Sequence, residues 1–319
     1  MSFSSNVKRE LSHHFGNARH CNIAEIAAII NMCGFIAVNK EKICVKIQTE
    51  NVLVAKRYFT LLKKTFNIYS EITVRKTRHL KKKRMYIVFL TNEDDIYRIL
   101  FSTGIMYKED NNQIIIKNDL YSIVVNSICC KRSYIRSAFL ASGSLTDPEK
   151  NYHMEFVCSK YDYSLKLKNL INSFEIDSKI IKRKENFVIY LKDGNQIVDL
   201  LNIMQAHVAL MELENVRILK DMRNNVNRIV NCETANLNKT VAASIKQTSD
   251  ILYIKDNMDI SKLSKPLFDL ANLRLSYQDA SLKELGEMMI PPVSKSGVNH
   301  RLRKISKIAK TLREENGDL

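Results

Sequence analysis

The sequence lacks paired cysteines, a long apolar run and an apolar leader. Its seven cysteines are an odd number with no CxxC pair, which argues against a disulfide framework and against a zinc ribbon. The most apolar stretch, IAEIAAIINMCGFIAV, is interrupted by Glu25 and Asn31 and is too short to span a bilayer. The opening MSFSSNVKRELSHH has no apolar core of a signal peptide. These absences predict a cytoplasmic protein with reduced thiols and no membrane partner.

The charge balance favours a polyanionic partner. The chain has 50 Lys and Arg residues against 34 Asp and Glu residues, which gives a net charge of +16 and a pI near 9.4. Because 45% of the residues are apolar, we expect a folded chain, and 319 residues are enough for two or three domains.

The first two-thirds of the chain contain the same order of predicted elements twice. The first copy has a helix over 21–33 that ends at Gly34, a hairpin over 35–49, a helix over 53–66, strands over 70–77 and 85–91, and a helix over 93–102. The second has a helix ending at Gly143, a hairpin around TDPEKN, a helix over 161–173, strands over 177–184 and 187–192, and a helix over 194–203. Short stretches also match, such as YIVFL (86–90) with FVIYL (187–191). Each copy is therefore predicted as αββαββα.

One hairpin of the first copy is longer and basic. The spacing between the copies falls from 108 residues (72 to 180) to 101 residues (86 to 187), so the first copy has seven extra residues there. They fall in RKTRHLKKKR, residues 75–84. We expect this loop to hold DNA nonspecifically, while the saddle-like sheet face is an alternative site for a protein. The secondary DNA-binding residues are Arg75, Lys76, Arg78, Lys81, Lys82, Lys83 and Arg84.

The two helices that end in glycine resemble a known motif. Small residues, Ala24, Ala27 and Ala28 in one helix and Ala138, Ala141 and Ser142 in the other, allow close packing about a pseudo-twofold axis. IAAIINMCG (26–34) and IRSAFLASG (135–143) resemble two degenerate copies of the LAGLIDADG motif of homing endonucleases. That family needs an acidic residue before each glycine, because divalent metals take hard oxygen ligands. Cys33 and Ser142 stand there, so we expect the scaffold without its metals.

Other acidic and histidine side chains leave an enzyme as an alternative. His153 and Glu155 lie two residues apart on a predicted strand near Asp147, and could serve a metal-dependent DNA endonuclease with unorthodox ligands. A solvated strand face after an Asp-Pro turn is favoured. We interpret four further residues as surface residues, and expect no catalytic residue, metal, cofactor or small-molecule substrate. The four are His13, His14, His20 and Cys21.

The last third is predicted to be helical. A connecting helix over 205–230 is followed by an Asn-rich stretch, and we expect a break near 231–240. Four helices then follow, over 241–256, 264–275, 281–289 and 294–313. Ser281 and Glu284 form a predicted capping box, Pro291 and Pro292 end that helix, and Ser294 caps the next. A turn of four residues between the last two helices is typical of a helix-turn-helix.

The final helix separates by face. Val298, Leu302, Ile305, Ile308, Ala309 and Leu312 form one stripe, and residues 294–313 hold seven Lys or Arg residues and no acid. In a recognition helix the first half reaches base edges in the major groove. Asn299 and Arg303 suit adenine and guanine, at roughly 1–3 kcal/mol of discrimination each. Gly297 either permits close approach to a DNA backbone or suits tight packing. The predicted DNA-binding residues are Ser294, Lys295, Ser296, Asn299, His300, Arg301, Arg303, Lys304 and Lys307.

Three stretches resemble the WhiA family: VSKSGVNHRLRKI, RNNVNRIVNCETANLNKT and AFLASGSLTDPEKNYHMEF. The resemblance covers essentially the whole chain. It implies a DNA-binding regulator linked to sporulation, cell division and chromosome segregation, with a degenerate homing-endonuclease-like domain that does not cleave DNA. We therefore expect an α+β fold with a LAGLIDADG-like domain over 1–205, a connecting helix and linker over 206–235, and an all-α helix-turn-helix domain over 236–319.

The expected function is sequence-specific binding of double-stranded DNA in transcription regulation by a cytoplasmic, nucleoid-associated, non-enzymatic protein. RNA polymerase or another regulator is a further expected partner. An RNA-binding or splicing helper is a third reading, because it could use the same duplicated scaffold and basic loop.

Overall fold

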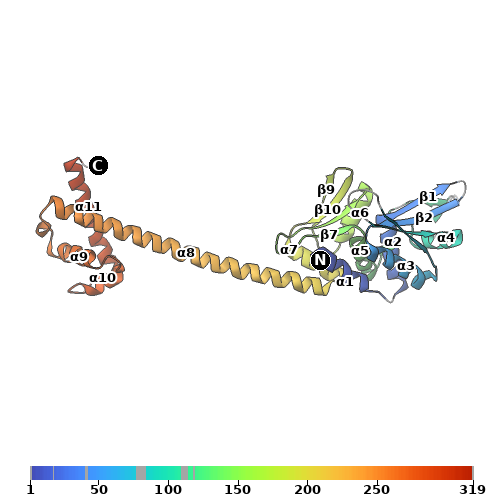
Figure 1. Cartoon of the computed structure of the whole chain (residues 1–319), viewed down its shortest axis with the longest axis horizontal. Coiled ribbons are helices and arrows are strands. Elements are labelled where there is room, and N and C mark those ends of the chain that lie inside the picture. Colours follow the sequence, from blue (N-terminus) through green and yellow to red (C-terminus); the bar gives the residue numbers. More distant parts are fainter. Residues whose placement is uncertain are drawn as a thin grey trace. The chain divides into compact units, whose positions relative to one another are not determined.

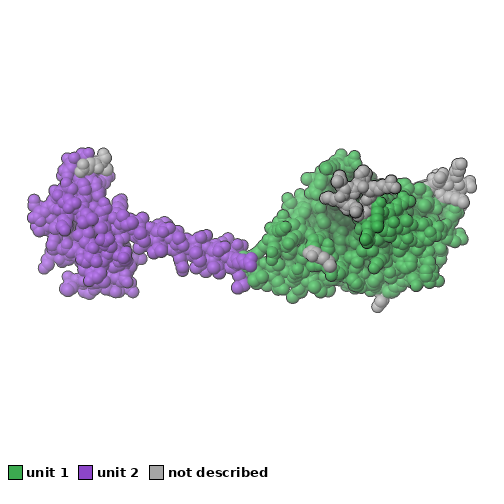
Figure 2. Space-filling view, viewed as in Figure 1, with its two compact units in different colours: residues 1–220 green, residues 221–319 purple. Residues whose placement is uncertain are grey.

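The computed structural model describes residues 2–16, 18–39, 42–76, 84–108, 114–117 and 119–317. Residues 1–220 and 221–319 form two compact units (Figure 2), and each is described by itself. Among the described helices, none is both long and apolar enough to cross a membrane.

The first unit contains two antiparallel sheets with the same strand order. These orders are β1-β2-β4-β3 and β7-β8-β10-β9, and a short β5-β6 pair stands between the two sheets in the sequence. The repeated order confirms the duplication predicted from the sequence. The strands are β1 (Gly34–Asn39), β2 (Lys42–Thr49), β3 (Glu71–Lys76), β4 (Arg84–Leu90), β5 (Met106–Lys108), β6 (Ile114–Ile116), β7 (Gly143–Leu145), β8 (Met154–Cys158), β9 (Lys179–Arg183) and β10 (Asn186–Leu191).

The helices of this unit also follow the predicted order. Several begin with a side-chain cap: Asn51, Asn92 and Asp193 each accept a hydrogen bond from an amide of the first turn. The predicted helices occur with ends shifted by a few residues at most. The helices are α1 (Phe3–His13), α2 (Arg19–Cys33), α3 (Val52–Phe66), α4 (Glu93–Ser102), the 3-10 turn η1 (Ser122–Val125), α5 (Ile128–Ser142), α6 (Tyr161–Asn172) and α7 (Gly194–Met204).

The helices α2 and α5 pack side by side in the centre of the unit (Figure 1). Ala24, Ala27, Ala28 and Ala138 are buried between or beside them, and such small side chains let two helix backbones approach closely. Most of both helices is buried on all sides, which explains why neither shows a strong apolar face. The expected central helix pair is therefore confirmed.

A buried ionic triad ties this pair to its neighbours. Glu25 of α2 accepts hydrogen bonds from Arg57 of α3, at 2.5 and 2.8 Å, and from Arg136 of α5, at 2.6 Å. Arg57 also donates to the carbonyl oxygen of His14 at 2.6 Å, and Arg136 donates to Gln205 at 2.7 Å. Because charges this deeply buried must be paired, the triad fixes α2, α3 and α5 in one arrangement.

The helix α8 runs without interruption from His207 to Asn257, so the break predicted at 231–240 is wrong. The stretch is Asn-rich but contains no glycine or proline, and residues 221–243 are exposed on every side. A helix that is solvated all round tolerates polar side chains. Thr240 even donates to the carbonyl oxygen of Asn236 within the helix. The polar composition therefore marked a solvated helix, not a linker.

The second unit packs three further helices on the end of α8. They are α9 (Lys265–Ser276), α10 (Leu282–Met288) and α11 (Lys295–Asn316), and η2 (Ile260–Lys262) leads into them. Ile251 and Ile254 of α8 are fully buried in the core that they share. An ion pair of 2.7 Å between Asp250 and Arg313 connects α8 to α11. The helices predicted over 264–275, 281–289 and 294–313 are all present.

Candidate nucleic-acid interface

The helices α10 and α11 form a helix-turn-helix whose ends are set by side-chain caps. The predicted capping box is present: Ser281 accepts from the amide of Glu284, and the Glu284 carboxylate accepts from the amide of Ser281. Ser294 caps α11 by accepting from the amide of Gly297 at 3.3 Å. Met289 is the C-cap of α10 and Ser294 is the N-cap of α11, so four residues, 290–293, lie between the two caps, as predicted.

Two glycines allow the turn to lie close to both helices. A Cβ on Gly286 would lie 2.1 Å from the carbonyl oxygen of Val293, whose own amide donates to Gly286 at 2.9 Å. A Cβ on Gly297 would lie 2.6 Å from a methyl carbon of Val293. Of the two explanations offered for Gly297, tight packing inside the domain is the one that these contacts support.

The apolar stripe of α11 faces the core as predicted. Val298, Leu302, Ile305 and Ala309 are at most 2% exposed, and Ile308 and Leu312 are partly buried against the same cluster. This orientation fixes which side chains of the helix face outward. The opposite face is exposed, and it carries Ser294, Lys295, Ser296, His300, Arg303, Lys304 and Lys307.

Some basic side chains of α11 contact other side chains of the domain, and others have no such contact among the described residues. Arg301 is half-buried with a guanidinium nitrogen 3.4 Å from the Met289 sulfur, Lys310 pairs with Glu314, and Arg313 pairs with Asp250. Asn299 is half-buried on the exposed side. The remaining four basic groups form neither an ion pair nor a side-chain hydrogen bond with any residue that the structure describes. They are Lys295, Arg303, Lys304 and Lys307.

The first sheet presents a second basic surface. Lys46 and Gln48 of β2 line a shallow cavity of about 380 Å³ over the open sheet face, together with Thr73 and Arg75 of β3. The Lys46 ammonium lies 4.5 Å from the ring centroid of Phe35. Cys44, Met85, Ile87 and Phe89 complete the lining, so the open face of this sheet combines positive charge with apolar side chains.

The predicted basic loop begins and ends beside this sheet face. Arg75, Lys76 and Arg84 are exposed at the ends of β3 and β4. The other predicted residues of the loop lie outside the described residues. They are Arg78, Lys81, Lys82 and Lys83.

The motif positions at the ends of α2 and α5 do not suit magnesium. Cys33 and Ser142 line a cavity of about 570 Å³ with Lys8 and Glu50, and Glu50 is the one carboxylate among its described lining residues. Burial raises the pKa of Cys33 to about 11, although the Lys8 charge opposes this rise. The thiol is therefore neutral, and a neutral thiol, a hydroxyl and an ammonium group are poor ligands for Mg²⁺. The residues present do not fit a two-metal nuclease site.

The alternative acidic residues are already engaged. The Glu155 carboxylate accepts from Ser144 at 3.1 Å, and lies 3.3 Å from both His153 and Arg183. Asp147 accepts from the amide of Glu149 in the turn. These contacts give both carboxylates structural partners, and the side chains of His153 and Glu155 are half-buried instead of lying on the solvated strand face that was expected.

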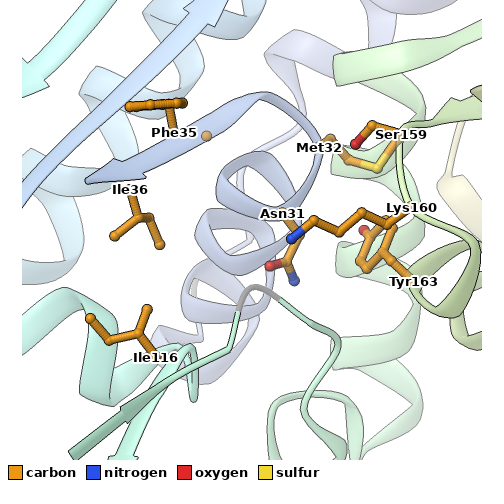
Figure 3. A pocket seen from close by; sticks show the side chains of 9 residues that line it. Asn31, Met32, Phe35, Ile36, Ile116, Ser159, Lys160 and Tyr163 are labelled. Carbon is orange, nitrogen blue, oxygen red and sulfur yellow. The ribbon is translucent and has the colours of Figure 1, made fainter. Parts of the chain in front are cut away.

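A further cavity of about 460 Å³ lies between α2, β1 and the start of α6 (Figure 3). Asn31 donates to Tyr134 at 2.8 Å, and the hydroxyl groups of Tyr134 and Tyr163 lie 2.9 Å apart. Burial raises the pKa of both tyrosines, so this network is neutral. Lys160 lies at the cavity rim with Ser159. The cavity lining contains no acidic residue among those described, so it offers no anionic ligand for a metal ion.

The prediction that four His and Cys residues are surface residues is wrong for Cys21. Cys21 is 6% exposed, and His20 lies beside it with its Nδ1 atom 3.0 Å from the Cys130 sulfur. His13 is exposed and His14 is half-buried. The sequence interpretation missed this grouping because Cys129 and Cys130 come from the second copy.

Comparisons with known proteins cover the whole chain. The chain is 48% identical over 316 residues to the probable cell division protein WhiA of Lachnoclostridium phytofermentans, which spans 98% of this chain and 100% of that protein. It is 50% identical over 310 residues to the probable cell division protein WhiA of Alkaliphilus metalliredigens, and this match spans 97% of this chain and 98% of that protein. The crystal structure of full-length WhiA from Thermatoga maritima covers 98% of this chain and 99% of its own, with a TM-score of 0.60 and 22% identity, and shows a shared fold.

Three family models match successive parts of the sequence. The WhiA N-terminal LAGLIDADG-like domain matches residues 19–106, the WhiA LAGLIDADG-like domain matches 131–223, and the WhiA C-terminal HTH domain matches 226–309. The first two cover the two structural copies, and the third covers the helix-turn-helix. Because relatives named WhiA are 48–50% identical to this chain and the matches cover at least 97% of it, the chain belongs to the WhiA family.

Proposed function

We propose that this protein is a non-enzymatic, sequence-specific binder of double-stranded DNA, and that α11 is its recognition helix. The observation that supports this most is the outward face of α11, on which Lys295, Arg303, Lys304 and Lys307 are exposed without a partner among the described residues. A solvated helix usually mixes charges of both signs, whereas residues 294–313 contain no acid. Phosphate groups are the natural counter-charges for such a surface.

The position of each side chain on α11 separates two roles. Ser296, Asn299, His300 and Arg303 lie in the first half of the helix, which reaches base edges in helix-turn-helix proteins. Asn299 then pairs with adenine and Arg303 with guanine, at about 1–3 kcal/mol of discrimination each. The phosphate contacts come from Lys295, Arg301, Lys304 and Lys307, with Arg301 limited by its contact to Met289.

The first unit adds a second, less specific contact in this proposal. The exposed residues Arg75, Lys76 and Arg84 stand at one edge of the sheet face that carries Lys46. Lys and Arg side chains on such a surface bind the phosphate backbone without reading sequence. Footprinting of the full chain beside residues 236–319 measures this contribution. An identical footprint for both proteins would remove the first unit from DNA binding.

We further propose that DNA binding serves transcription regulation at the nucleoid. The relatives named as probable cell division proteins suggest genes of cell division as targets. Genes of chromosome segregation, and sporulation genes in spore formers, are further proposed targets. RNA polymerase or another regulator is a proposed partner. Mapping of bound chromosomal sites, together with transcript levels after depletion, tests this step. Bound sites whose neighbouring transcripts do not change would point to a direct role in division.

The central experiment selects binding sites from a random DNA library with the full chain. We expect one enriched sequence, and fluorescence anisotropy on it should show affinity falling about 10²–10³-fold between 50 and 200 mM salt if about five phosphates are neutralised. Arg303→Ala and Asn299→Ala should each relax selection at one position while keeping the salt dependence. Lys304→Ala should weaken binding to all DNA sequences equally. It should also reduce the slope of log affinity against log salt concentration by about one. Lys283→Ala removes a charge from α10, where Lys283 pairs with Glu287, and should change neither property.

Two outcomes would contradict the proposal. Unchanged discrimination by both Arg303→Ala and Asn299→Ala would remove α11 from base recognition. Competition by structured RNA that is as strong as competition by the selected DNA would favour the RNA-binding alternative.

A further inference from the structure

Four metal-binding side chains gather where the two central helices begin. They are His20 and Cys21 of α2 with Cys129 and Cys130 of α5, and their ligand atoms all lie within 4.8 Å of one another. The Nδ1 atom of His20 lies 3.0 Å from the Cys130 sulfur and 3.5 Å from the Cys21 sulfur. Cys21 and Cys130 are buried, whereas His20 and Cys129 are exposed. The group is the one cluster of this kind among the residues that the structure describes.

The duplicated fold explains why these residues meet. Cys21 precedes Gly34 by 13 residues (34 − 21), and Cys130 precedes Gly143 by 13 residues (143 − 130). His20 and Cys129 correspond in the same way, so all four side chains occupy the second and third positions of two equivalent helices. Side-by-side packing of α2 and α5 then brings the two pairs together. The site is therefore a product of the pseudo-twofold arrangement.

We propose that His20, Cys21, Cys129 and Cys130 bind one zinc ion in a closed, tetrahedral site that joins the two halves of the first unit. Zinc is held in structural sites by Cys₃His sets, with Zn–S distances near 2.3 Å and Zn–N distances near 2.0–2.1 Å. Those bonds place ligand atoms about 3.8 Å apart or slightly less. The distances between the four atoms, from 3.0 Å to at most 4.8 Å, therefore reach this geometry by changes of about 1 Å or less, which rotation of the side chains supplies.

The electrostatic setting favours a cation with thiolate ligands. Three thiolates whose sulfur atoms lie within 4.8 Å of one another repel, so they cannot coexist here without a positive ion. Binding replaces three S–H protons by three Zn–S bonds, releases those protons to solvent and leaves a complex of net charge −1. The amino-terminal ends of both helices stabilise negative charge.

The soft ligand set discriminates between cations. Magnesium and calcium prefer oxygen ligands, whereas three thiolates and an imidazole suit zinc. Ser133 lies one turn after Cys129 and Cys130 on α5, and its hydroxyl accepts from Arg136 at 3.2 Å. The buried triad around Glu25 therefore reaches the turn of α5 that follows the proposed ligands.

The test measures zinc in the full-length protein, purified without a histidine tag under reducing conditions. Mass spectrometry of the metal content should give one zinc ion per chain, and a thiol-specific mercurial should release it. Cys21→Ser and Cys130→Ser should bind less than a tenth of an equivalent, whereas Cys44→Ser, which removes an exposed cysteine elsewhere, should keep the full amount. Cobalt should replace zinc with a thiolate charge-transfer band and a tetrahedral visible spectrum.

A second variant distinguishes loss of a zinc ligand from loss of the folded structure. His20→Cys alters an exposed ligand and should keep metal binding while shifting the cobalt spectrum to that of a four-thiolate site. A chelator should lower the Tm of the wild type and of Cys44→Ser alike. The proposal is overturned if the folded, reduced wild type binds no zinc after addition and dialysis. It is also overturned if intact-mass analysis finds a disulfide between Cys21 and Cys130 in cells.

Discussion

Removal of the Glu25 carboxylate is the sharpest test of how the first unit is held together. The side chains of Glu25 and Arg57 are 0% exposed, and that of Arg136 is 2% exposed. Glu25→Ala leaves two guanidinium groups facing each other in the interior without a counter-charge. Burial already lowers the pKa of Arg57, and Glu25 is the partner that opposes this shift.

The magnitude follows from what each arginine keeps. Breaking a buried ion pair costs about 3–5 kcal/mol. Arg57 keeps its hydrogen bonds to the carbonyl oxygens of Ser12 and His14, and Arg136 keeps its hydrogen bond to Gln205. The loss of stability is therefore smaller than the sum for two broken ion pairs. We expect a loss of about 5 kcal/mol in the free energy of unfolding for Glu25→Ala and about 3 kcal/mol for Glu25→Gln, because the amide keeps one acceptor. For a unit of this size the larger loss lowers the Tm by about 10–20 °C.

Calorimetry is the suitable assay, because the chain contains no tryptophan for fluorescence. Hydrogen exchange assigns the shifted transition to residues 1–220. The matched control is Glu185→Ala, which removes an exposed carboxylate from the same unit and should change the free energy by less than about 0.5 kcal/mol.

The rescue variant combines Glu25→Leu, Arg57→Met and Arg136→Met, and it should recover most of the lost stability, since apolar replacements of buried triads pack well. If Glu25→Ala and the Glu185→Ala control have the same free energy of unfolding, the two arginines are not buried charges that need Glu25, and the reasoning fails.

Three further predictions concern the turn, an acid-sensitive pair and the motif positions. Gly286→Ala should destabilise the second unit by about 1–3 kcal/mol, because its Cβ meets the Val293 carbonyl. Thermal unfolding measures this, and an unchanged Tm would contradict the close contact. At Asp119, burial alone would raise the pKa, but hydrogen bonds from Lys166 and the Leu120 amide, with the Lys166 and Lys117 charges, lower it. Its stabilisation is therefore present above the ordinary aspartate pKa and is lost as the pH falls through the lowered value. Asp119→Asn should lower the neutral-pH Tm and flatten the acid side of the Tm–pH curve, and parallel curves would refute this. Supercoiled plasmid should stay intact with Mg²⁺ or Mn²⁺, and nicking that Glu155→Gln abolishes would instead support the endonuclease alternative.

Most of the fold was predictable, because its signals are local and repeated. Glycines after two apolar helices, alternating strands and matched spacings gave the duplicated αββαββα order, and the strand orders confirm it. The capping residues Ser281 and Ser294 were predictable for the same reason, since a cap acts on its own first turn. The apolar stripe of α11 followed from helical periodicity alone.

The predictions failed where a residue's role depends on distant partners or on the absence of partners. The polar stretch at 231–240 was interpreted as a break, yet nothing packs there among the described residues, and solvation alone suits a polar helix. The buried Glu25 triad was not predicted, because Arg57 and Arg136 are 32 and 111 residues away from Glu25 in sequence. Cys21 was assigned to the surface for the same reason. Aligning the copies on Gly34 and Gly143 was the available signal that would have paired Cys21 with Cys130.

The two ends of the central helix pair differ in the metal-ligating side chains that they offer. At the carboxyl ends, Cys33 is isolated and protonated beside Lys8, and Ser142 offers a buried hydroxyl that lacks a described partner. At the amino ends, three thiols and an imidazole converge within 4.8 Å. Hard divalent ions need carboxylates, and soft ligand sets select zinc. A chelator should therefore lower the stability of the first unit while leaving DNA binding by α11 unchanged at a temperature where both units stay folded, because the proposed zinc site belongs to the scaffold and α11 uses only its own side chains.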